Sequence, residues 1–180
     1  MAMNLGFILT RSALSRPHHP AIIHGERVLT YKMFNERVNR LASAMRNMGL
    51  KPNDRVGLFS PNKPELLESM FAIWKAGFTA VPMNFRLHPK EVEYILNDSQ
   101  TRVLIFAEEF SKSIGGIAPH LTTTDRFICI GGKPDFGSDR TRSYEQILAD
   151  GNPSEYVAEV TGDDVAWLFY TSGTTGKPKG

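Results

Sequence analysis

The sequence predicts an α/β fold in which a largely parallel sheet is flanked by helices. From Arg55 onward, short apolar runs alternate with stretches of helical periodicity. Each run is apolar throughout, which is typical of strands covered on both faces, and the alternation implies right-handed crossovers between parallel strands. The length of 180 residues and a hydrophobic fraction of 41% favour one compact unit with a sizeable core.

Composition excludes several classes of protein. The charged fraction of 22% is that of an ordinary globular chain, not of a disordered one. The 21 Lys and Arg and 19 Asp and Glu are interspersed, so nucleic acid is not expected as a partner. The single cysteine, Cys129, lies in an apolar run and predicts a buried thiol in a reducing compartment. No apolar run approaches the ~18 residues of a transmembrane helix, so we expect a soluble cytoplasmic protein.

The N-terminal region is expected to form a helix followed by a hairpin. No acidic residue precedes Glu26, which faintly resembles a transit peptide, but the apolar patch at residues 5–9 favours a packed helix. Two β-favouring runs, at residues 21–23 and 28–30, flank a turn-prone segment and predict the hairpin.

An amphipathic helix is predicted next, over residues 30–49. Thr30 can accept hydrogen bonds from the first free amides as an N-cap, and Gly49, followed closely by Pro52, supplies a stop. Apolar residues recur at spacings of three or four along it, with polar ones between them. The apolar positions are Phe34, Val38, Leu41, Met45 and Met48.

Strands and helices then alternate along the chain. A helix over residues 64–76, with a proline in its first turn, ends at Gly77, and a shorter helix ends at residues 97–99. Loops are expected at residues 115–116, 131–142 and 151–164. The predicted strands are 56–59, 79–81, 103–106, 127–130 and 165–170.

Several side chains that could suggest chemistry have simpler interpretations. Asp163 and Asp164 fit a turn better than a metal site, and Trp167 fits the core. An apolar stripe at helical spacing could face a lipid but is more often core: Leu67, Met70, Phe71 and Trp74. The histidines lack the spacing of metal ligands, so no metal site is predicted from them: His18, His19, His24, His88 and His120.

The segment from Tyr170 to Gly180 carries the strongest signal for chemistry. Glycines, hydroxyl side chains and two lysines directly follow a predicted buried strand. A polyphosphate needs closely approaching backbone N–H groups, hydroxyl donors and fixed positive charge, and this composition supplies all three. The ordinary P-loop is excluded, because it requires four residues between its glycines and a hydroxyl after its lysine, whereas Pro178 follows Lys177 here.

This segment resembles the signature phosphate-binding loop of the adenylate-forming, or AMP-binding, enzymes, which include acyl-CoA and aryl-CoA synthetases, luciferases and peptide-synthetase adenylation domains. Supporting stretches occur in the same order at residues 29–31, 49–56, 74–77 and 81–84. The resemblance covers the chain from about Pro20 to Gly180. It implies that residues 1–180 are the N-terminal part of the AMP-binding domain, truncated at the phosphate-binding loop.

The resemblance also implies an activity. Such enzymes activate a carboxylic acid with ATP as an acyl-adenylate and transfer the acyl group to a thiol, usually of CoA, with Mg²⁺ present. The loop would hold the ATP phosphates. The residues implied are Thr171, Ser172, Gly173, Thr174, Thr175, Gly176, Lys177, Lys179 and Gly180. The catalytic lysine and the magnesium and adenine ligands would follow residue 180, so no catalytic residue is assigned in this chain.

Alternatives remain open at this point. A fatty acid is the first expectation for the acyl substrate, with an aryl-CoA ligase or a peptide-synthetase adenylation domain as the next. A non-catalytic interaction fragment is a different class. Residues 1–180 alone are expected to be inactive and prone to self-association, and the loop is expected to have an anchor at Tyr170 and none beyond it.

Overall fold

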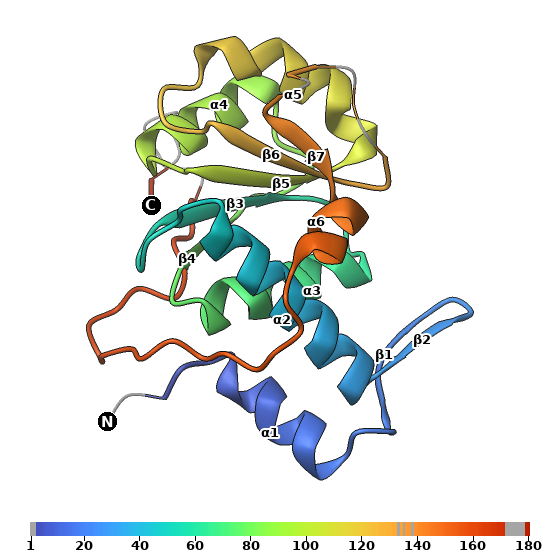
Figure 1. Ribbon diagram of the computed structural model, residues 1–180. Helices are drawn as coiled ribbons and strands as arrows, with labels where there is room; N and C mark the ends of the chain where they lie inside the picture. Colours follow the sequence, from blue (N-terminus) through green and yellow to red (C-terminus); the bar gives the residue numbers. More distant parts are fainter. Residues whose placement is uncertain (1–2, 133, 135, 138, 172–178) are drawn as a thin grey trace. The chain divides into compact units, whose positions relative to one another are not determined.

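The computed structural model describes residues 3–132, 134, 136–137, 139–171 and 179–180 (Figure 1). Its contacts divide the chain into two compact units, where the length favoured one. The first unit comprises Met1–Asn53, Asn62–Phe78 and Ile147–Ala166. The second unit comprises Asp54–Pro61, Thr79–Gln146 and Trp167–Gly180. The helix α6 (Tyr144–Asp150) contains residues of both.

The second unit contains a five-stranded parallel sheet with the order β4-β3-β5-β6-β7. In its register, Val56 of β3 is opposite both Ala80 of β4 and Val103 of β5. Four of the predicted apolar runs form strands, and the prediction of a parallel α/β fold is confirmed. The strands are β3 (Arg55–Phe59), β4 (Thr79–Pro82), β5 (Val103–Ala107), β6 (Arg126–Ile130) and β7 (Thr141–Ser143).

Two helices of this unit, α4 (Pro89–Asp98) and α5 (Ser111–Ile117), cover the same face of the sheet (Figure 1). Short 3-10 helices flank α5, at Glu108–Phe110 and Ala118–His120. The predicted α4 is confirmed, and His88 and Glu91 cap it reciprocally. The core of the second unit contains Leu96, Leu104, Phe106, Phe127 and Cys129, all less than 3% exposed.

Helix α5 was missed because the Gly115-Gly116 pair favours a loop. In the structure the ring of Phe136 lies against Gly115, so close that a Cβ added there would be 3.1 Å from the Phe136 ring. A glycine inside this helix therefore serves a close approach of an aromatic ring, which the sequence alone does not reveal.

The strand predicted over residues 165–170 is not formed. Trp167 makes one isolated parallel bridge with Ala80 of β4, and the Leu168 N–H donates to the Ala80 carbonyl at 2.8 Å. The prediction that Trp167 is core is also wrong, because this ring is half-buried and stacks on Phe169, which is 59% exposed. A segment at a sheet edge gains ladder hydrogen bonds on one side only, so apolar composition alone does not enforce a strand.

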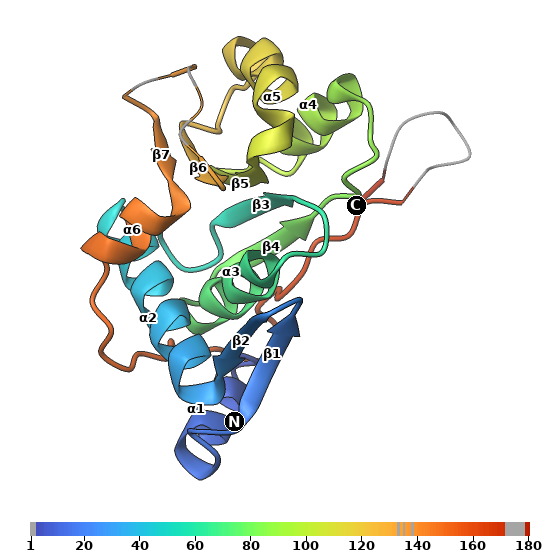
Figure 2. The same ribbon diagram turned by 90° about the vertical axis from the view of Figure 1, so that its right-hand side faces the viewer.

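The first unit is built from three helices and a two-stranded hairpin. They are α1 (Phe7–Ser15), β1 (Pro20–His24), β2 (Arg27–Thr30), α2 (Tyr31–Asn47) and α3 (Pro64–Lys75). Figure 2 shows the antiparallel hairpin beside α2. The predicted helices and hairpin are confirmed. The Thr30 hydroxyl accepts from the Met33 N–H, and Gly49 has a φ of 90°, which suits glycine at a helix end.

The buried face of α3 is mixed: it combines the apolar Ala72 and Ile73 with charged side chains. The prediction that the stripe of Leu67, Met70, Phe71 and Trp74 is core is wrong, because none of these four is fully buried. Glu68 and Lys75 are fully buried, whereas Leu67 is 44% exposed and Trp74 is half-buried. Arg37 of α2 donates to both carboxylate oxygens of Glu68, at 2.7 and 3.1 Å. Bidentate pairing of this kind satisfies a carboxylate that has lost its water.

Lys75 occupies the centre of a second polar cluster. Its Nζ donates to the side-chain carbonyls of Asn35 and Asn39, both at 2.7 Å, and forms an ion pair with Glu155. Burial lowers the pKa of Lys75, and the Glu155 carboxylate opposes that shift. Burial tends to raise the pKa of Glu155, but donors led by Lys75 outweigh it and leave this pKa below its ordinary value.

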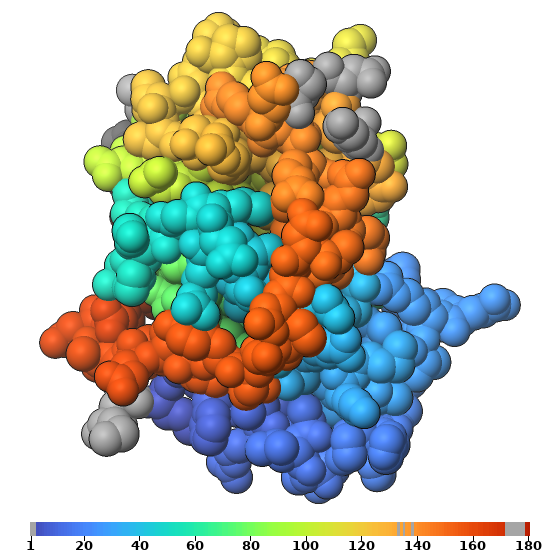
Figure 3. All heavy atoms as spheres, in the orientation of Figure 1, coloured from blue at the N-terminus to red at the C-terminus, as the bar shows by residue number. Residues whose placement is uncertain are grey.

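Glu155 belongs to the segment of residues 151–166. The prediction of a loop over residues 151–164 is confirmed. Figure 3 shows this segment, in orange to red, on the surface of the first unit beside α1 and α2. Asn39 donates to the Pro153 carbonyl, and Arg40 donates to the Gly151 carbonyl. The loop is therefore fastened to α2 through backbone carbonyls that would otherwise lack partners.

Candidate functional site

The base of the predicted phosphate-binding loop is a pair of hydrogen-bonded residues in the second unit. The Thr171 N–H donates to the Lys179 carbonyl at 2.9 Å, and the Lys179 N–H donates to the Thr171 carbonyl at 3.0 Å. This is the reciprocal pattern of an antiparallel pair. Thr171 and Lys179 are therefore neighbours in space although they are eight positions apart in the sequence. The expectation that the loop has no anchor beyond Tyr170 is wrong.

The chain reaches this base along β4. The bridge between Trp167 and Ala80 is parallel, so the segment runs in the direction of the sheet strands and continues past its bridge to Thr171. Ligands of open α/β sheets bind beyond the carboxyl ends of the strands. The orientation of this segment is that of a ligand-binding loop, although it is not itself a regular strand.

Tyr170 connects the base to α4. Its hydroxyl donates to Asp98 Oδ2 at 2.6 Å, and the hydroxyl of Tyr94 lies 3.5 Å from the other oxygen of that carboxylate. Burial, and then the nearby Asp98 charge, raise the pKa of Tyr170, so the phenol keeps its proton and acts as the donor. The ring of Tyr170 packs against Gly180, where an added Cβ would lie 2.7 Å from the ring.

The structure brings together three of the predicted site residues, Thr171, Lys179 and Gly180. The side chains of Thr171 and Lys179 are exposed and lie on the two arms of the base, and the Thr171 hydroxyl donates to the Lys179 carbonyl at 3.5 Å. The exposed ammonium group of Lys179 places positive charge where an anion could meet it. The other predicted site residues lie outside the described part of the chain: Ser172, Gly173, Thr174, Thr175, Gly176 and Lys177.

Sequence reasoning missed Asp98 altogether. It is 72 positions from Tyr170 and lies at the end of a helix, where its only local signal was that of a helix stop. The described residues offer no set of magnesium ligands. Among residues 3–171, with three gaps at 133, 135 and 138, and 179–180, no three His, Cys, Asp or Glu side chains are grouped as a metal site would require.

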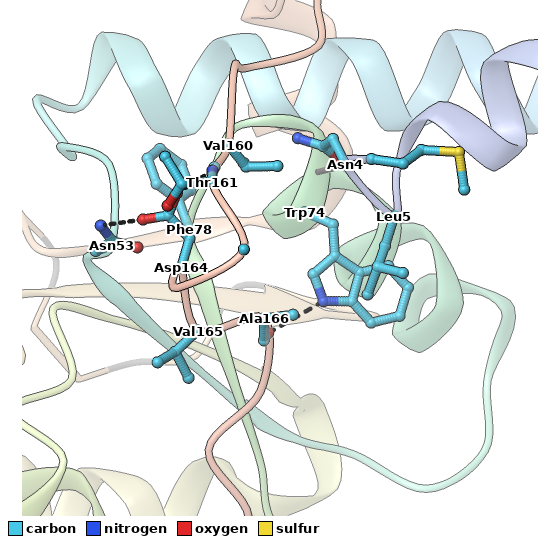
Figure 4. Close-up of a pocket in the computed structure, with 13 residues that line it drawn as sticks. Asn4, Leu5, Asn53, Trp74, Phe78, Val160, Thr161, Asp164, Val165 and Ala166 are labelled. Atoms are coloured by element: carbon cyan, nitrogen blue, oxygen red, sulfur yellow. Dashed lines mark hydrogen bonds between the residues drawn. The ribbon is translucent and has the colours of Figure 1, made fainter. Parts of the chain in front are cut away.

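A separate pocket of about 280 Å³ lies in the first unit (Figure 4). Trp74 and Phe78 line it, and its polar groups bond to one another. Asp164 accepts from Asn53 Nδ2 and from the Thr161 N–H, and Trp74 Nε1 donates to the Ala166 carbonyl at 3.1 Å. The turn predicted at Asp164 is confirmed, and its carboxylate is committed to holding that turn.

Comparison with known proteins identifies the family. The sequence matches the AMP-binding enzyme family over residues 9–180. The chain belongs to this family. It is 38% identical to a feruloyl-CoA synthase of Amycolatopsis sp over 98% of this chain and 32% of that protein. It is also 31% identical to a 3-oxocholest-4-en-26-oate–CoA ligase of Rhodococcus rhodochrous, over 100% of this chain and 33% of that protein.

A solved relative shows the same fold. The structure of an anthranilate CoA ligase, AuaEII, in complex with anthranoyl-AMP superposes with a TM-score of 0.91 and 31% identity. The match covers 98% of this chain and 33% of that one. The family resemblance predicted from the loop is therefore confirmed. This AMP-binding chain spans about a third of the length of the relatives it matches, and no helix in its described part is long and apolar enough to cross a membrane.

Proposed function

We propose that this chain is the N-terminal part of the AMP-binding domain of an ATP-dependent acid–CoA ligase. Family membership supports the proposal, together with the CoA-ligase and CoA-synthase activities named for the relatives above. The structural observation that carries it is the paired base at Thr171 and Lys179, which holds the two ends of a glycine- and hydroxyl-rich segment together. Together these features make a phosphate-binding loop.

The reaction would proceed in two steps. A carboxylate oxygen of the acid attacks the α-phosphorus of ATP, the bond to the β-phosphate oxygen breaks, and pyrophosphate leaves. The CoA thiol then attacks the acyl carbon, and AMP leaves. Negative charge moves onto the pyrophosphate in the first step, so fixed positive charge and donors around it lower the barrier.

Each loop residue has a role in this proposal. Lys177 and Lys179 supply charge to the β- and γ-phosphates, and the hydroxyls of Thr171, Ser172, Thr174 and Thr175 donate to phosphate oxygens. Gly173, Gly176 and Gly180 let the backbone approach the phosphates closely. When bound, Mg²⁺ would neutralise phosphate charge, and the described residues offer no group of three His, Cys, Asp or Glu side chains that could hold it.

The acyl substrate is part of the proposal. A fatty acid is favoured first, by the resemblance of residues 30–97 to fatty acyl-CoA synthetases. An aromatic acid is the second candidate, because the feruloyl-CoA synthase and the anthranilate CoA ligase match this chain at 38% and 31% identity. We further propose a cytoplasmic location, where ATP and CoA are available as cosubstrates.

The test uses the complete protein that carries this chain and, in parallel, residues 1–180 alone. Acid-dependent pyrophosphate–ATP exchange is measured over fatty and aromatic acids. We expect exchange with one class of acid in the complete protein and none in residues 1–180. A reading frame that ends at codon 180, or exchange by residues 1–180 alone, would contradict the proposal and favour an interaction fragment or a different active site.

Variants of the loop sharpen this test. Lys177→Ala and Gly176→Val in the complete protein should each slow exchange by about a hundredfold or more, since one preorganised electrostatic contact is worth ~3 kcal/mol in such sites. Lys112→Ala, a lysine on α5, serves as the matched control and should leave exchange within about twofold. Loop variants that exchange within about threefold of the unaltered protein would show that the loop does not contact the phosphates.

A further inference from the structure

We propose that Asp98 is a positioning residue for the ATP half-reaction, because it holds Tyr170 against Gly180 at the base of the phosphate-binding loop. The inference rests on the proposed function of that loop. It assigns a role to a carboxylate on α4 that has no place in the loop motif. Neither Asp98 nor Tyr170 is proposed to contact the substrates.

A short hydrogen bond joins two distant parts of the chain. Tyr170 Oη donates to Asp98 Oδ2 at 2.6 Å, within the range of charge-assisted O–H···O⁻ bonds. Asp98 is the last residue of α4, a helix whose Ile95 and Leu96 are less than 2% exposed in the core beside the sheet. The carboxylate is therefore presented by an element that is itself fixed by packing.

The Tyr170 side chain links α4 to both arms of the loop base. Tyr170 immediately precedes Thr171 on the entering arm, and its ring packs on Gly180, which immediately follows Lys179 on the leaving arm. Thr171 and Lys179 are themselves joined by two backbone hydrogen bonds. One side chain thus connects α4 to the entry and the exit of the loop.

The contacts of Tyr170 fix the orientation of the loop base, which the backbone pair of Thr171 and Lys179 alone leaves free. A single antiparallel pair closes the loop but can rotate as a unit about the chain that leads into it. The Tyr170 ring, like Leu168, packs against the core cluster of the second unit. The ring is therefore held by packing, and its hydroxyl is held by Asp98. Loss of the Asp98 contact would free the ring while the base pair remains, and the phosphates would then meet a less ordered loop.

The two half-reactions distinguish positioning from general stability. Formation of the acyl-adenylate needs the β- and γ-phosphates in place. Transfer of the acyl group from preformed acyl-adenylate to CoA does not, because pyrophosphate has already left. A residue that orients the phosphate loop should therefore affect the first reaction and spare the second, whereas a residue that only stabilises the fold should affect both.

The experiment measures both half-reactions in the complete protein for Tyr170→Phe, Asp98→Asn and the double variant. Tyr170→Phe keeps the ring on Gly180 and removes only the donor. Each single variant should lower kcat/KM for ATP in adenylate formation about tenfold, the usual effect of losing one hydrogen bond to a charged group. Transfer from synthetic acyl-adenylate should stay within about twofold, and the melting temperature should fall by less than about 3 °C.

Coupling between the two residues completes the test. If they act through one hydrogen bond, the double variant should lose about tenfold, as either single variant does. A loss of about a hundredfold, the product of two independent effects, would overturn the inference. Tyr94→Phe is the matched control, because it removes a phenol hydroxyl near the same carboxylate without changing the link to the loop. It should stay within about twofold, and a tenfold loss there would also overturn the inference.

The outcomes separate this inference from the proposed function. If the unaltered complete protein forms no acyl-adenylate with any acid, the proposed function fails. If it forms acyl-adenylate and Tyr170→Phe does so at the same rate, the proposed function stands and the role of Asp98 is rejected. Equal losses in adenylate formation and in acyl transfer would show a structural role only and would likewise reject positioning.

Discussion

The two units of this chain differ in the side chains that they bury. In the second unit the core cluster is apolar, with Leu104, Phe106 and Cys129 packed between the sheet and its helices. In the described part of the chain, the charged side chains in the buried class all belong to the first unit: Glu65, Glu68 and Lys75. One unit is held by the removal of apolar surface from water, and the other adds fully paired charges to that contribution.

The difference shows how each unit should respond to change. An apolar core loses stability in proportion to the volume removed, and no second substitution elsewhere restores it without refilling the cavity. A buried ion pair loses stability when one partner is removed, because the other charge is left without compensation, but removal of both partners costs far less. Substitutions in each unit therefore test this difference directly.

The largest effect is expected in the second unit, for Phe106→Ala. Phe106 is fully buried, and its ring lies 5.9 Å from that of Phe136. Removal of such a ring costs about 3–5 kcal/mol of unfolding free energy through lost transfer energy and the cavity left behind. Urea unfolding followed by circular dichroism measures it. Phe169→Ala, at a ring that is 59% exposed, is the control and should cost less than about 1 kcal/mol.

A somewhat smaller effect is expected in the first unit, for Arg37→Met. The variant leaves the buried Glu68 carboxylate with only the Arg27 guanidinium, 3.6 Å away. The cost should be about 3 kcal/mol by urea unfolding, at the low end for a broken buried pair because Arg27 remains. Arg37→Met combined with Glu68→Leu should recover most of that loss. A double variant as unstable as the single one would remove the contrast between the units.

The smallest effect is a dependence of stability on acidic pH, which we expect from Glu155 of the first unit. The folded-state pKa of Glu155 is lowered, so its contribution to stability is present above the ordinary value of 4.5 and is lost as the pH falls through the folded-state value. The unfolding free energy should therefore decline less steeply below about pH 4.5 in Glu155→Gln than in the unaltered chain. Parallel declines in both proteins would show that the Lys75 cluster does not hold this charge.

The same contrast explains which parts of the fold were predictable. The strands β3, β5 and β6 were found because a continuous apolar run is typical of a strand covered on both faces of a parallel sheet, whereas the run at residues 165–170, at the sheet edge, is not covered in this way. The buried face of α3 was not, because Arg37 and Glu155, which neutralise its charges, are distant in the sequence. Periodicity assigns apolar residues to the core by default and has no means of recognising a paired charge.

For the candidate site too, one part was predictable from the sequence and another was not. Its chemistry was evident from the order of glycines, hydroxyls and lysines, since phosphate binding depends on local backbone and composition. The pairing of Thr171 with Lys179 and the contact between Tyr170 and Asp98 depend on how the chain folds back on itself. The second contact joins a helix end to a loop entry, and no motif spans that separation.

Cys129 gives the second unit a reporter of its own. It is the single cysteine of the sequence and lies fully buried in β6, between β5 and β7 of the sheet. A thiol reagent can reach it only when the sheet opens, so the rate of labelling under native conditions measures the opening of that unit alone. Labelling of this native thiol therefore reports when the sheet becomes exposed, without an engineered label and without a signal from the first unit.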